Sequence, residues 1–270
     1  MKSVLEFQAR KEQGWPISMV TCYDYSSAVI VSQSKVDCIL VGDSASQVMH
    51  GAKNTTGATM EQMILHTRSV AQAENHPFLI ADMPLMSYRK GLSQAMENIE
   101  ALVRAGAQAI KLEGAKGNLE VIQHSVHSGV PVMGHLGLTP QHVHQLGGHK
   151  VQGKDPEQHP EIINDAIRLQ EAGCFAVVLE CVPATLAKTI TQNLKIPTIG
   201  IGAGSDTNGQ VLVWHDLLGL NLGHRPKFVK SYLEAGQLFK DCLNQYVVEV
   251  VSGDFPKAEQ SYKVRSYASD

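Results

Sequence analysis

Four acidic residues stand at or near the C-terminal ends of short apolar runs. They are Asp43, Asp82, Glu113 and Glu180, and the first three follow consecutive runs. If these runs are neighbouring parallel strands, three carboxylates converge and repel one another unless a cation or a proton neutralises them. Oxygen ligands without a His or Cys cluster favour Mg²⁺ over Zn²⁺. The pattern therefore predicts a hard-metal site formed by Asp43, Asp82 and Glu113, although a single acid at a strand end is as often a helix cap or an ion-pair partner.

Three further side chains are candidates for binding an anion beside these acids. Lys111 lies two residues before Glu113, so both project from the same side of one strand. If that side is buried, the ammonium needs an anion, which is either a substrate carboxylate or a metal-binding acid. His135 ends the next apolar run and can donate to an anionic substrate. Ser44 is either a donor to the same ligand or a helix cap.

Glu180 remains as a carboxylate outside the metal set. A metal that chelates the carboxylate and keto oxygens of a 2-oxo acid polarises the carbonyl and acidifies the adjacent carbon. Glu180 can then accept the proton as a general base. These residues predict a metal-stabilised enolate that makes or breaks a C–C bond, and they do not identify the substrate.

The segments that must position these residues alternate between strand-like and helix-like patterns. Apolar runs rich in β-branched residues are typical of parallel strands covered on both faces. The expected strands are 17–23, 38–44, 78–84, 109–114, 130–137, 175–181, 197–204 and 210–214, and the clearest amphipathic helices are 59–72, 93–105, 160–172 and 184–193. Eight such units predict an α/β fold, a (β/α)8 TIM barrel, with its active site at the C-terminal ends of the strands. An open doubly wound sheet is the alternative, but the chain lacks a glycine-rich turn after its first strand.

The rest of the chain is expected to complete a single domain over residues 1–270. Residues 1–15 are expected to form an N-terminal helix that caps the bottom of the barrel, and residues 227–251 a long terminal helix. The glycines of 200–204 either cradle a phosphate or allow close packing at the barrel rim. The length of 270 residues suits one α/β barrel, which commonly takes about 250.

Charge and cysteine usage indicate the compartment and exclude some partners. Lys and Arg total 23 and Asp and Glu total 26, giving a net charge of −3, which argues against nucleic-acid binding. The five cysteines are odd in number and include no C-x-x-C pair. With no secretory signal and no apolar run of membrane-spanning length, we expect a reduced, cytoplasmic protein that binds no membrane.

Motifs spread over nearly the whole chain also carry a family resemblance. The matching segments are 20–28 (VTCYDYSSA), 40–44 (LVGDS), 59–66 (TMEQMILH), 81–88 (ADMPLMSY), 109–114 (AIKLEG), 132–141 (VMGHLGLTPQ), 150–154 (KVQGK), 178–183 (VLECVP), 199–204 (IGIGAG) and 209–220 (GQVLVWHDLLGL). In their order and spacing the chain resembles the ketopantoate hydroxymethyltransferase family.

The resemblance implies a (β/α)8 barrel of the phosphoenolpyruvate/pyruvate superfamily, assembled as a homodecamer of two pentameric rings. It implies transfer of a hydroxymethyl group from 5,10-methylenetetrahydrofolate to 3-methyl-2-oxobutanoate through a Mg²⁺-stabilised enolate. The product would be 2-dehydropantoate, in the first step of pantothenate biosynthesis. The residues that match the family's roles are Asp43, Asp82 and Glu113 for Mg²⁺; Asp43, Ser44, Asp82, Lys111 and His135 for substrate; and Glu180 for the proton.

Two other interpretations remain at this point. A metal-dependent lyase of a 2-oxo acid or phosphonate, from the same superfamily, would use the same metal and enolate without folate. The second interpretation is a non-enzymatic barrel that binds a small anion. The complete set of acids together with Lys111 argues against it. Dependence of product formation on tetrahydrofolate separates the transferase from the lyase.

Overall fold

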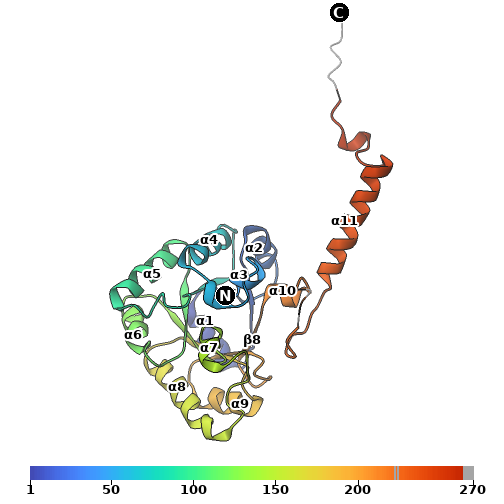
Figure 1. The fold of residues 1–270 in the computed structure, drawn as a ribbon. Coiled ribbons are helices and arrows are strands. Elements are labelled where there is room, and N and C mark those ends of the chain that lie inside the picture. The colour runs from blue at the N-terminus through green and yellow to red at the C-terminus, as the bar shows by residue number, and fades with distance from the viewer. Residues whose placement is uncertain (222, 224, 264–270) are drawn as a thin grey trace, which may run out of the picture. The chain divides into compact units, whose positions relative to one another are not determined.

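The fold is a closed barrel of eight parallel strands in sequence order, with β8 paired back onto β1 (Figure 1). The computed structural model describes residues 1–221, 223 and 225–263. The strands are β1 (Ile17–Thr21), β2 (Cys38–Val41), β3 (Phe78–Asp82), β4 (Ala109–Glu113), β5 (Val132–Gly137), β6 (Ala176–Glu180), β7 (Thr198–Ile201) and β8 (Gly209–Leu212). The predicted (β/α)8 barrel is confirmed, and the open doubly wound sheet was the wrong alternative.

Helices follow or precede the strands along the chain. They are α1 (Val4–Gln13), α2 (Tyr25–Ser32), α3 (Ala45–Val48), α4 (Met60–Ala71), α5 (Leu92–Arg104), α6 (Leu119–His127), α7 (Val143–Leu146), α8 (His159–Glu171), α9 (Ala184–Asn193), α10 (Trp214–Leu217) and α11 (Ala235–Ser252). Short 3₁₀ turns lie at η1 (Thr55–Gly57), η2 (Pro140–His142), η3 (Pro156–Gln158) and η4 (Ala258–Gln260). Outside the barrel, α2, α4, α5, α6, α8 and α9 pack side by side in chain order.

Apart from β5, which ends at Gly137 as predicted, the observed strands end one to three residues earlier than the sequence pattern suggests. β2, for example, stops at Val41, and residues 42–44 turn into α3, where Ala45 N–H bonds the Gly42 carbonyl. The four amphipathic helices predicted at 59–72, 93–105, 160–172 and 184–193 are found within one residue of their expected ends. α2 was not predicted, because its residues are apolar on most sides and give no helical period.

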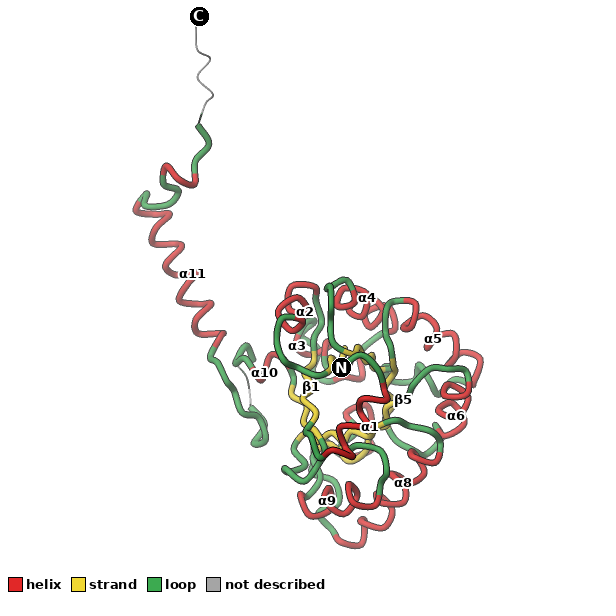
Figure 2. The backbone as a smooth tube through the Cα atoms, turned by 180° about the vertical axis from the view of Figure 1, so that it is seen from behind, coloured by secondary structure: helices red, strands yellow, loops and turns green. Residues whose placement is uncertain are grey.

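One end of the barrel interior is filled with apolar side chains. Phe7 of α1 is fully buried there and packs edge-on against Phe78 and Phe175, with ring centroids 5.6 and 5.0 Å away. Figure 2 shows α1 lying across this end of the strands. The predicted N-terminal capping helix is therefore confirmed. The strand residues of this core are Ile17, Met19, Cys38, Leu40, Phe78, Ile80, Ala109, Met133, Ala176, Val178, Ile199 and Val211.

Local signals explain where several helices begin and end. Thr59 caps α4 in a capping box, in which its hydroxyl accepts from Gln62 N–H while the Gln62 side chain accepts from Thr59 N–H. Gly106 and Gly173 follow the ends of α5 and α8 with φ of +115° and +98°. Only glycine adopts such values without strain, so both helices end where the sequence predicts.

The chain divides into two compact units, and the prediction of one domain over 1–270 stays a prediction. The barrel unit contains Met1–Trp214 and Pro226–Val229, and the second unit contains His215–Arg225 and Lys230–Asp270. In the second unit α11 begins at Ala235, eight residues later than predicted. The preceding segment instead bonds to 217–219, through Tyr232 N–H to the Leu217 carbonyl and Ala235 N–H to the Leu218 carbonyl.

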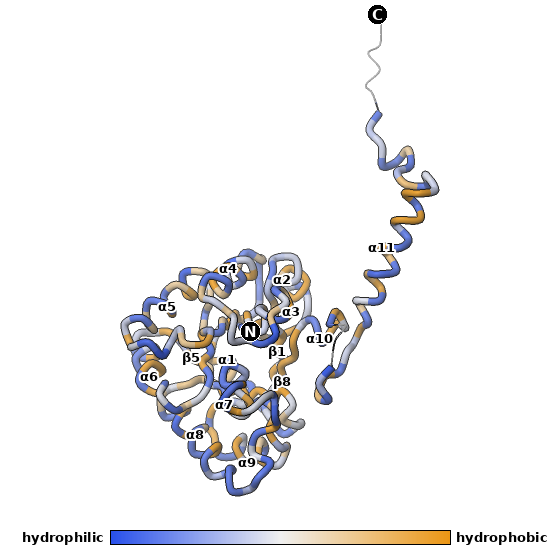
Figure 3. The backbone as a smooth tube through the Cα atoms, viewed as in Figure 1, coloured by the Kyte–Doolittle hydropathy of each residue, from blue (hydrophilic) through white to orange (hydrophobic). Residues whose placement is uncertain are grey.

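α11 alternates between polar and apolar residues along its length (Figure 3). Its apolar side chains are exposed, among them Leu238, Phe239, Leu243, Tyr246, Val247, Val248, Val250 and Val251. The hydropathy of the helices in the described part of the chain is too low for any of them to cross a membrane.

Candidate active site

The interior positions of the strands change from apolar to ionisable at their C-terminal ends. On β3 the interior residue Ile80 is followed two positions later by Asp82, and on β4 Ala109 is followed by Lys111 and Glu113. The period of two places them all on the interior side, as expected for Lys111 and Glu113. In register, Asp82 lies beside Lys111, and Glu113 beside its β5 neighbour His135.

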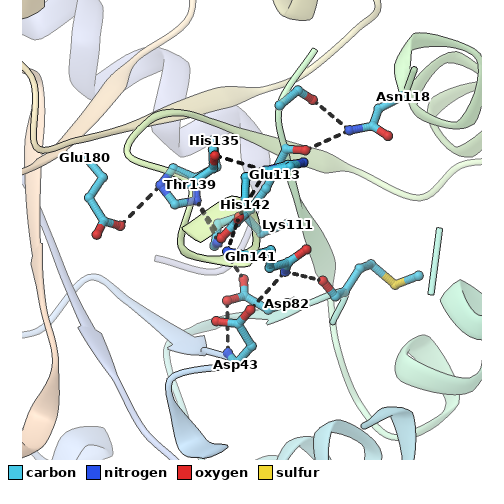
Figure 4. Close-up of polar contacts among 12 residues, drawn as sticks. Asp43, Asp82, Lys111, Glu113, Asn118, His135, Thr139, Gln141, His142 and Glu180 are labelled. Carbon is cyan, nitrogen blue, oxygen red and sulfur yellow. Dashed lines mark hydrogen bonds and ion pairs between the residues drawn. The ribbon is translucent and has the colours of Figure 1, made fainter. Parts of the chain in front are cut away.

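The acids are buried close to the lysine (Figure 4). Asp43, Asp82 and Glu113 are 4%, 2% and 1% exposed. Lys111 Nζ lies 3.1 Å from Asp82 Oδ1, and Asp43 N–H donates to Asp82 Oδ2 at 3.1 Å. Burial, followed by the charges of Asp82 and Glu113, raises the pKa of Asp43 well above its usual range. The structure thus brings the three predicted acids and Lys111 into one buried cluster with mutual repulsion.

His135 connects this cluster to Glu180. Its Nε2 lies 3.2 Å from Glu180 Oε2, and its Nδ1 lies 3.2 Å from Lys111 Nζ and 3.4 Å from Glu113 Oε1. Burial and the Lys111 charge lower the pKa of His135, but the adjacent Glu113 and Glu180 carboxylates outweigh these effects and raise it to about 9. The pKa of Glu113 is lowered, because bonds from His135 and the Lys111 charge exceed the opposing effect of burial. Glu180 retains 17% side-chain exposure and is the most accessible acid of the group.

Ser44 directly follows Asp43 and immediately precedes α3. Its hydroxyl is 2.8 Å from the hydroxyl of the buried Tyr23, and it makes no side-chain cap bond to α3. Ser44 thus occupies the N-cap position of α3 without capping it through its hydroxyl, and its role as a donor to a ligand stays a prediction. The backbone of Tyr23 is itself restrained, because the Nδ1 atom of His66 hydrogen-bonds the Tyr23 carbonyl at 2.6 Å.

Gln141 is the residue of this cluster that the sequence did not single out. It lies in η2, on the loop after β5, and is 4% exposed. Its Nε2 donates to Asp43 Oδ2 at 2.8 Å and to the Met83 carbonyl at 2.9 Å, and its backbone N–H donates to Glu113 Oε2 at 3.0 Å. No periodicity marks a loop glutamine. The one signal was its place at the end of the motif 132–141.

The donor chemistry of the cluster fits a hard divalent cation. Three buried carboxylates face one ammonium and one imidazole, and Asp82 Oδ1 and His135 Nε2 have no well-aligned hydrogen-bond partner despite the nearby Lys111 and Glu180. Within residues 1–221, 223 and 225–263, however, no three Asp, Glu, His or Cys side chains are gathered closely enough to form a metal site. The charge and ligand type therefore agree with Mg²⁺, and the coordination geometry is not preformed.

The structure also explains the glycines of residues 200–204 and the thiol of Cys181, which directly follows Glu180. A Cβ on Gly204 would lie 2.5 Å from Ala184 Cβ, and one on Gly202 would lie 2.8 Å from the Phe228 ring. This favours close packing over phosphate binding at residues 200–204. Burial raises the pKa of Cys181 to about 12, so its thiol is not an activated nucleophile.

The family model and the curated relatives that match this chain carry names for the same activity. A family model described as ketopantoate hydroxymethyltransferase matches residues 2–258. A curated 3-methyl-2-oxobutanoate hydroxymethyltransferase from Bdellovibrio bacteriovorus is 55% identical over 262 residues, covering 97% of this chain and 100% of the relative. Relatives of the same name from Francisella tularensis (52% identical, covering 97% and 99%) and Legionella pneumophila (53%, covering 95% and 98%) are similar throughout their length.

Solved structures resemble the chain at the level of the fold. A phosphonopyruvate hydrolase in complex with oxalate and Mg²⁺ aligns with a TM-score of 0.62 and 12% identity, over 98% of this chain and 93% of that one. A 2,3-dimethylmalate lyase of the phosphoenolpyruvate mutase/isocitrate lyase superfamily aligns with a TM-score of 0.60 and 12% identity, over 97% and 92%. These similarities concern the fold, and each extends over nearly the whole of this chain.

Proposed function

The chain belongs to the ketopantoate hydroxymethyltransferase family, and from this premise we propose how its barrel opening carries out the reaction. The reaction is transfer of a hydroxymethyl group to 3-methyl-2-oxobutanoate, a step of pantothenate biosynthesis. The one-carbon donor proposed is 5,10-methylenetetrahydrofolate, and the product is 2-dehydropantoate. Membership of this family favours the transferase over the lyase of the same superfamily.

Asp43, Asp82 and Glu113 are the residues proposed to hold Mg²⁺. The observation that supports them is that they lie buried in one cluster, where burial and then the negative charges of Asp82 and Glu113 raise the pKa of Asp43. A bound Mg²⁺ supplies a Lewis acid that polarises the keto group of the substrate and acidifies its C3 proton. It also removes the repulsion that the three carboxylates otherwise impose on one another.

Lys111 and His135 are proposed to hold the anionic substrate together with Asp43, Ser44 and Asp82. Lys111 is an ammonium held in place by Asp82, because its pKa is raised by the surrounding acids against the effect of burial. Its charge stabilises the negative oxygen that develops as the C3 proton leaves. The Ser44 hydroxyl, fixed by Tyr23, is a donor at the same opening.

Glu180 is proposed as the proton acceptor for C3. Its carboxylate is the most accessible acid in the group, and His135 Nε2 fixes one of its oxygens at 3.2 Å. With that oxygen held, the second oxygen is free to take the proton. One water molecule hydrolyses the C–N bonds to the methylene carbon of the folate, which releases tetrahydrofolate and leaves that carbon as formaldehyde. The enolate of the substrate then forms the new C–C bond with the formaldehyde carbon, and the resulting alkoxide takes a proton back from Glu180 to give the hydroxymethyl group. The protein contributes orientation and charge stabilisation, while the folate supplies the electrophilic carbon.

The direct test is product formation from purified protein, Mg²⁺ and 3-methyl-2-oxobutanoate, with and without methylenetetrahydrofolate. We expect 2-dehydropantoate only when both Mg²⁺ and the folate are present. Cleavage of a 2-oxo acid or phosphonate without folate would contradict the transferase and support the lyase.

The proposed assembly is a homodecamer of two pentameric rings. α11 carries a continuous apolar face, of which Leu243 is 64% and Val247 56% exposed, and such a face is stable when another surface covers it. A second copy of the chain provides an apolar surface that can cover this face, since Tyr25 and Ile30 of α2 are 53% and 58% exposed. Light scattering should give ten chains per particle, and Leu243→Glu with Val247→Glu should give smaller particles. An unchanged mass for this double variant would contradict the role of α11.

We place the enzyme in the cytoplasm, where folate-dependent biosynthesis occurs and where its free cysteines stay reduced.

A further inference from the structure

We propose that Gln141 is a positioning residue that fixes Asp43 and Glu113 for cation binding, and that Tyr88 locks the Gln141 amide in place. The inference rests on the proposed cation site and adds to it two residues outside the family roles given above.

The Gln141 side chain has only one workable orientation. Its Oε1 accepts from the Tyr88 hydroxyl at 2.6 Å, while its Nε2 donates to Asp43 Oδ2 and to the Met83 carbonyl. A flipped amide would set its oxygen against two acceptors, the carboxylate and the carbonyl, and lose both bonds. The amide therefore must donate to Asp43, and the hydroxyl of Tyr88 must donate to the amide.

The turn that carries Gln141 is also fixed. η2 begins at Pro140, and His142 N–H donates to the Thr139 carbonyl at 2.8 Å. The His142 ring Nδ1 lies 3.0 Å from the Thr139 hydroxyl. This rigid turn directs the Gln141 backbone N–H to Glu113 Oε2.

Gln141, in the loop after β5, thus donates a hydrogen bond to each of two acids (Figure 4). Asp43 follows β2, and Glu113 ends β4. Each bond restricts the rotation of a carboxylate that would otherwise move away from its charged neighbours. Donated hydrogen bonds also favour the ionised form of a carboxylate, and a cation binds that form. Gln141 therefore opposes the mutual repulsion of the acids before a cation arrives.

Two substitutions test this role in the full-length protein. Gln141→Met keeps the length and volume of the side chain and the backbone N–H but removes both side-chain donors. Tyr88→Phe keeps Gln141 and removes only the hydroxyl that donates to Gln141 Oε1. Binding of Mn²⁺ without substrate, measured by electron paramagnetic resonance, should weaken about 10- to 100-fold in Gln141→Met and less in Tyr88→Phe.

A matched control separates positioning from a general loss of hydrogen bonds. Gln210 is exposed, and its Nε2 also donates two bonds, to the Gly204 carbonyl and the Thr207 hydroxyl, with no acid involved. Gln210→Met should leave Mn²⁺ affinity unchanged. Excess Mn²⁺ should restore much of the turnover of Gln141→Met, which a purely structural defect would not allow.

The outcomes are distinct. If the wild type binds Mn²⁺ and the folded Gln141→Met and Tyr88→Phe variants bind it equally well, Gln141 is only structural and the inference is wrong. If Gln141→Met does not fold, unchanged affinity in Tyr88→Phe overturns it. If the wild type binds no divalent cation, the cation part of the proposed function fails first, and the inference fails with it.

Discussion

The two ends of the barrel interior are made from the same alternating strand positions and have opposite character. At one end the rings of Phe7, Phe78 and Phe175 pack against one another with no charge among them. At the other end the series on β4 reaches Lys111 and Glu113, buried among other charged groups. The apolar end stabilises the fold through buried area. The charged end is costly to bury, since ion pairs in the interior rarely repay their loss of hydration.

This difference assigns stability to one end and chemistry to the other. A change at the charged end should reduce turnover much more than stability. A change at the apolar end should do the reverse, because no group there is placed to touch a substrate at the strand C-terminal ends.

The largest expected effect is at the charged end. Glu180→Gln keeps a hydrogen-bonding partner for His135 but cannot accept the C3 proton. Turnover should fall by about 10²- to 10⁴-fold, the usual contribution of a general base. The thermal midpoint should change little, because Glu180 is partly exposed. Steady-state kinetics and Mn²⁺ binding check this, and an equal loss of metal binding would make Glu180 a ligand instead.

The apolar end should show the opposite result. Phe7→Ala removes a fully buried ring and should lower the free energy of unfolding by about 3–5 kcal/mol. Leu5→Ala, on the same helix but 77% exposed, should change it by less than about 0.5 kcal/mol. Urea denaturation measures both, and kcat of folded Phe7→Ala should stay near that of the wild type. A large fall in kcat without loss of stability would remove the distinction between the two ends.

The charged end should make stability depend on pH in the protein without metal. The folded-state pKa of His135 is about 9 against an ordinary 6.5, so protonation stabilises the folded state. This contribution is complete below about pH 6.5 and is lost as the pH rises to about 9, a decrease of about 3 kcal/mol. Urea denaturation in EDTA should show it in the wild type and not in His135→Gln. Stability that rises over this range would have the wrong sign.

Cation binding should give a somewhat smaller effect at the same end. Mg²⁺ at about 100 times its Kd should raise the free energy of unfolding by about 2.7 kcal/mol, and EDTA should reverse the gain. Asp43→Asn removes one charge from the proposed ligand set and should lose most of this response. Thermal denaturation with and without Mg²⁺ measures it, and an equal Mg²⁺ response in Asp43→Asn would place the cation elsewhere.

The sequence predicted what depends on strand period and order. The alternation along β4 placed Lys111 and Glu113 on one side, and chain order placed Asp82 and His135 on the adjacent strands. Gln141 could not be predicted in the same way, because its contact with Asp43 spans 98 residues and depends on the path of a loop. α2 lacked a helical period, and the start of α11 was displaced by the hydrogen bonds of 232–236 to 217–219. Such long-range contacts leave no pattern in the local sequence.

The most direct test of this account is exchange of the C3 proton of 3-methyl-2-oxobutanoate for deuterium, followed by proton NMR. With Mg²⁺ and no folate, the wild type should lose the C3 signal, because Glu180 removes that proton before any carbon is transferred. EDTA and Glu180→Gln should each suppress the exchange by at least about 10²-fold, whereas folded Phe7→Ala should retain it. Exchange that persists in Glu180→Gln, or that is lost in folded Phe7→Ala, would contradict the assignment of proton removal to Glu180 at the charged end of the barrel.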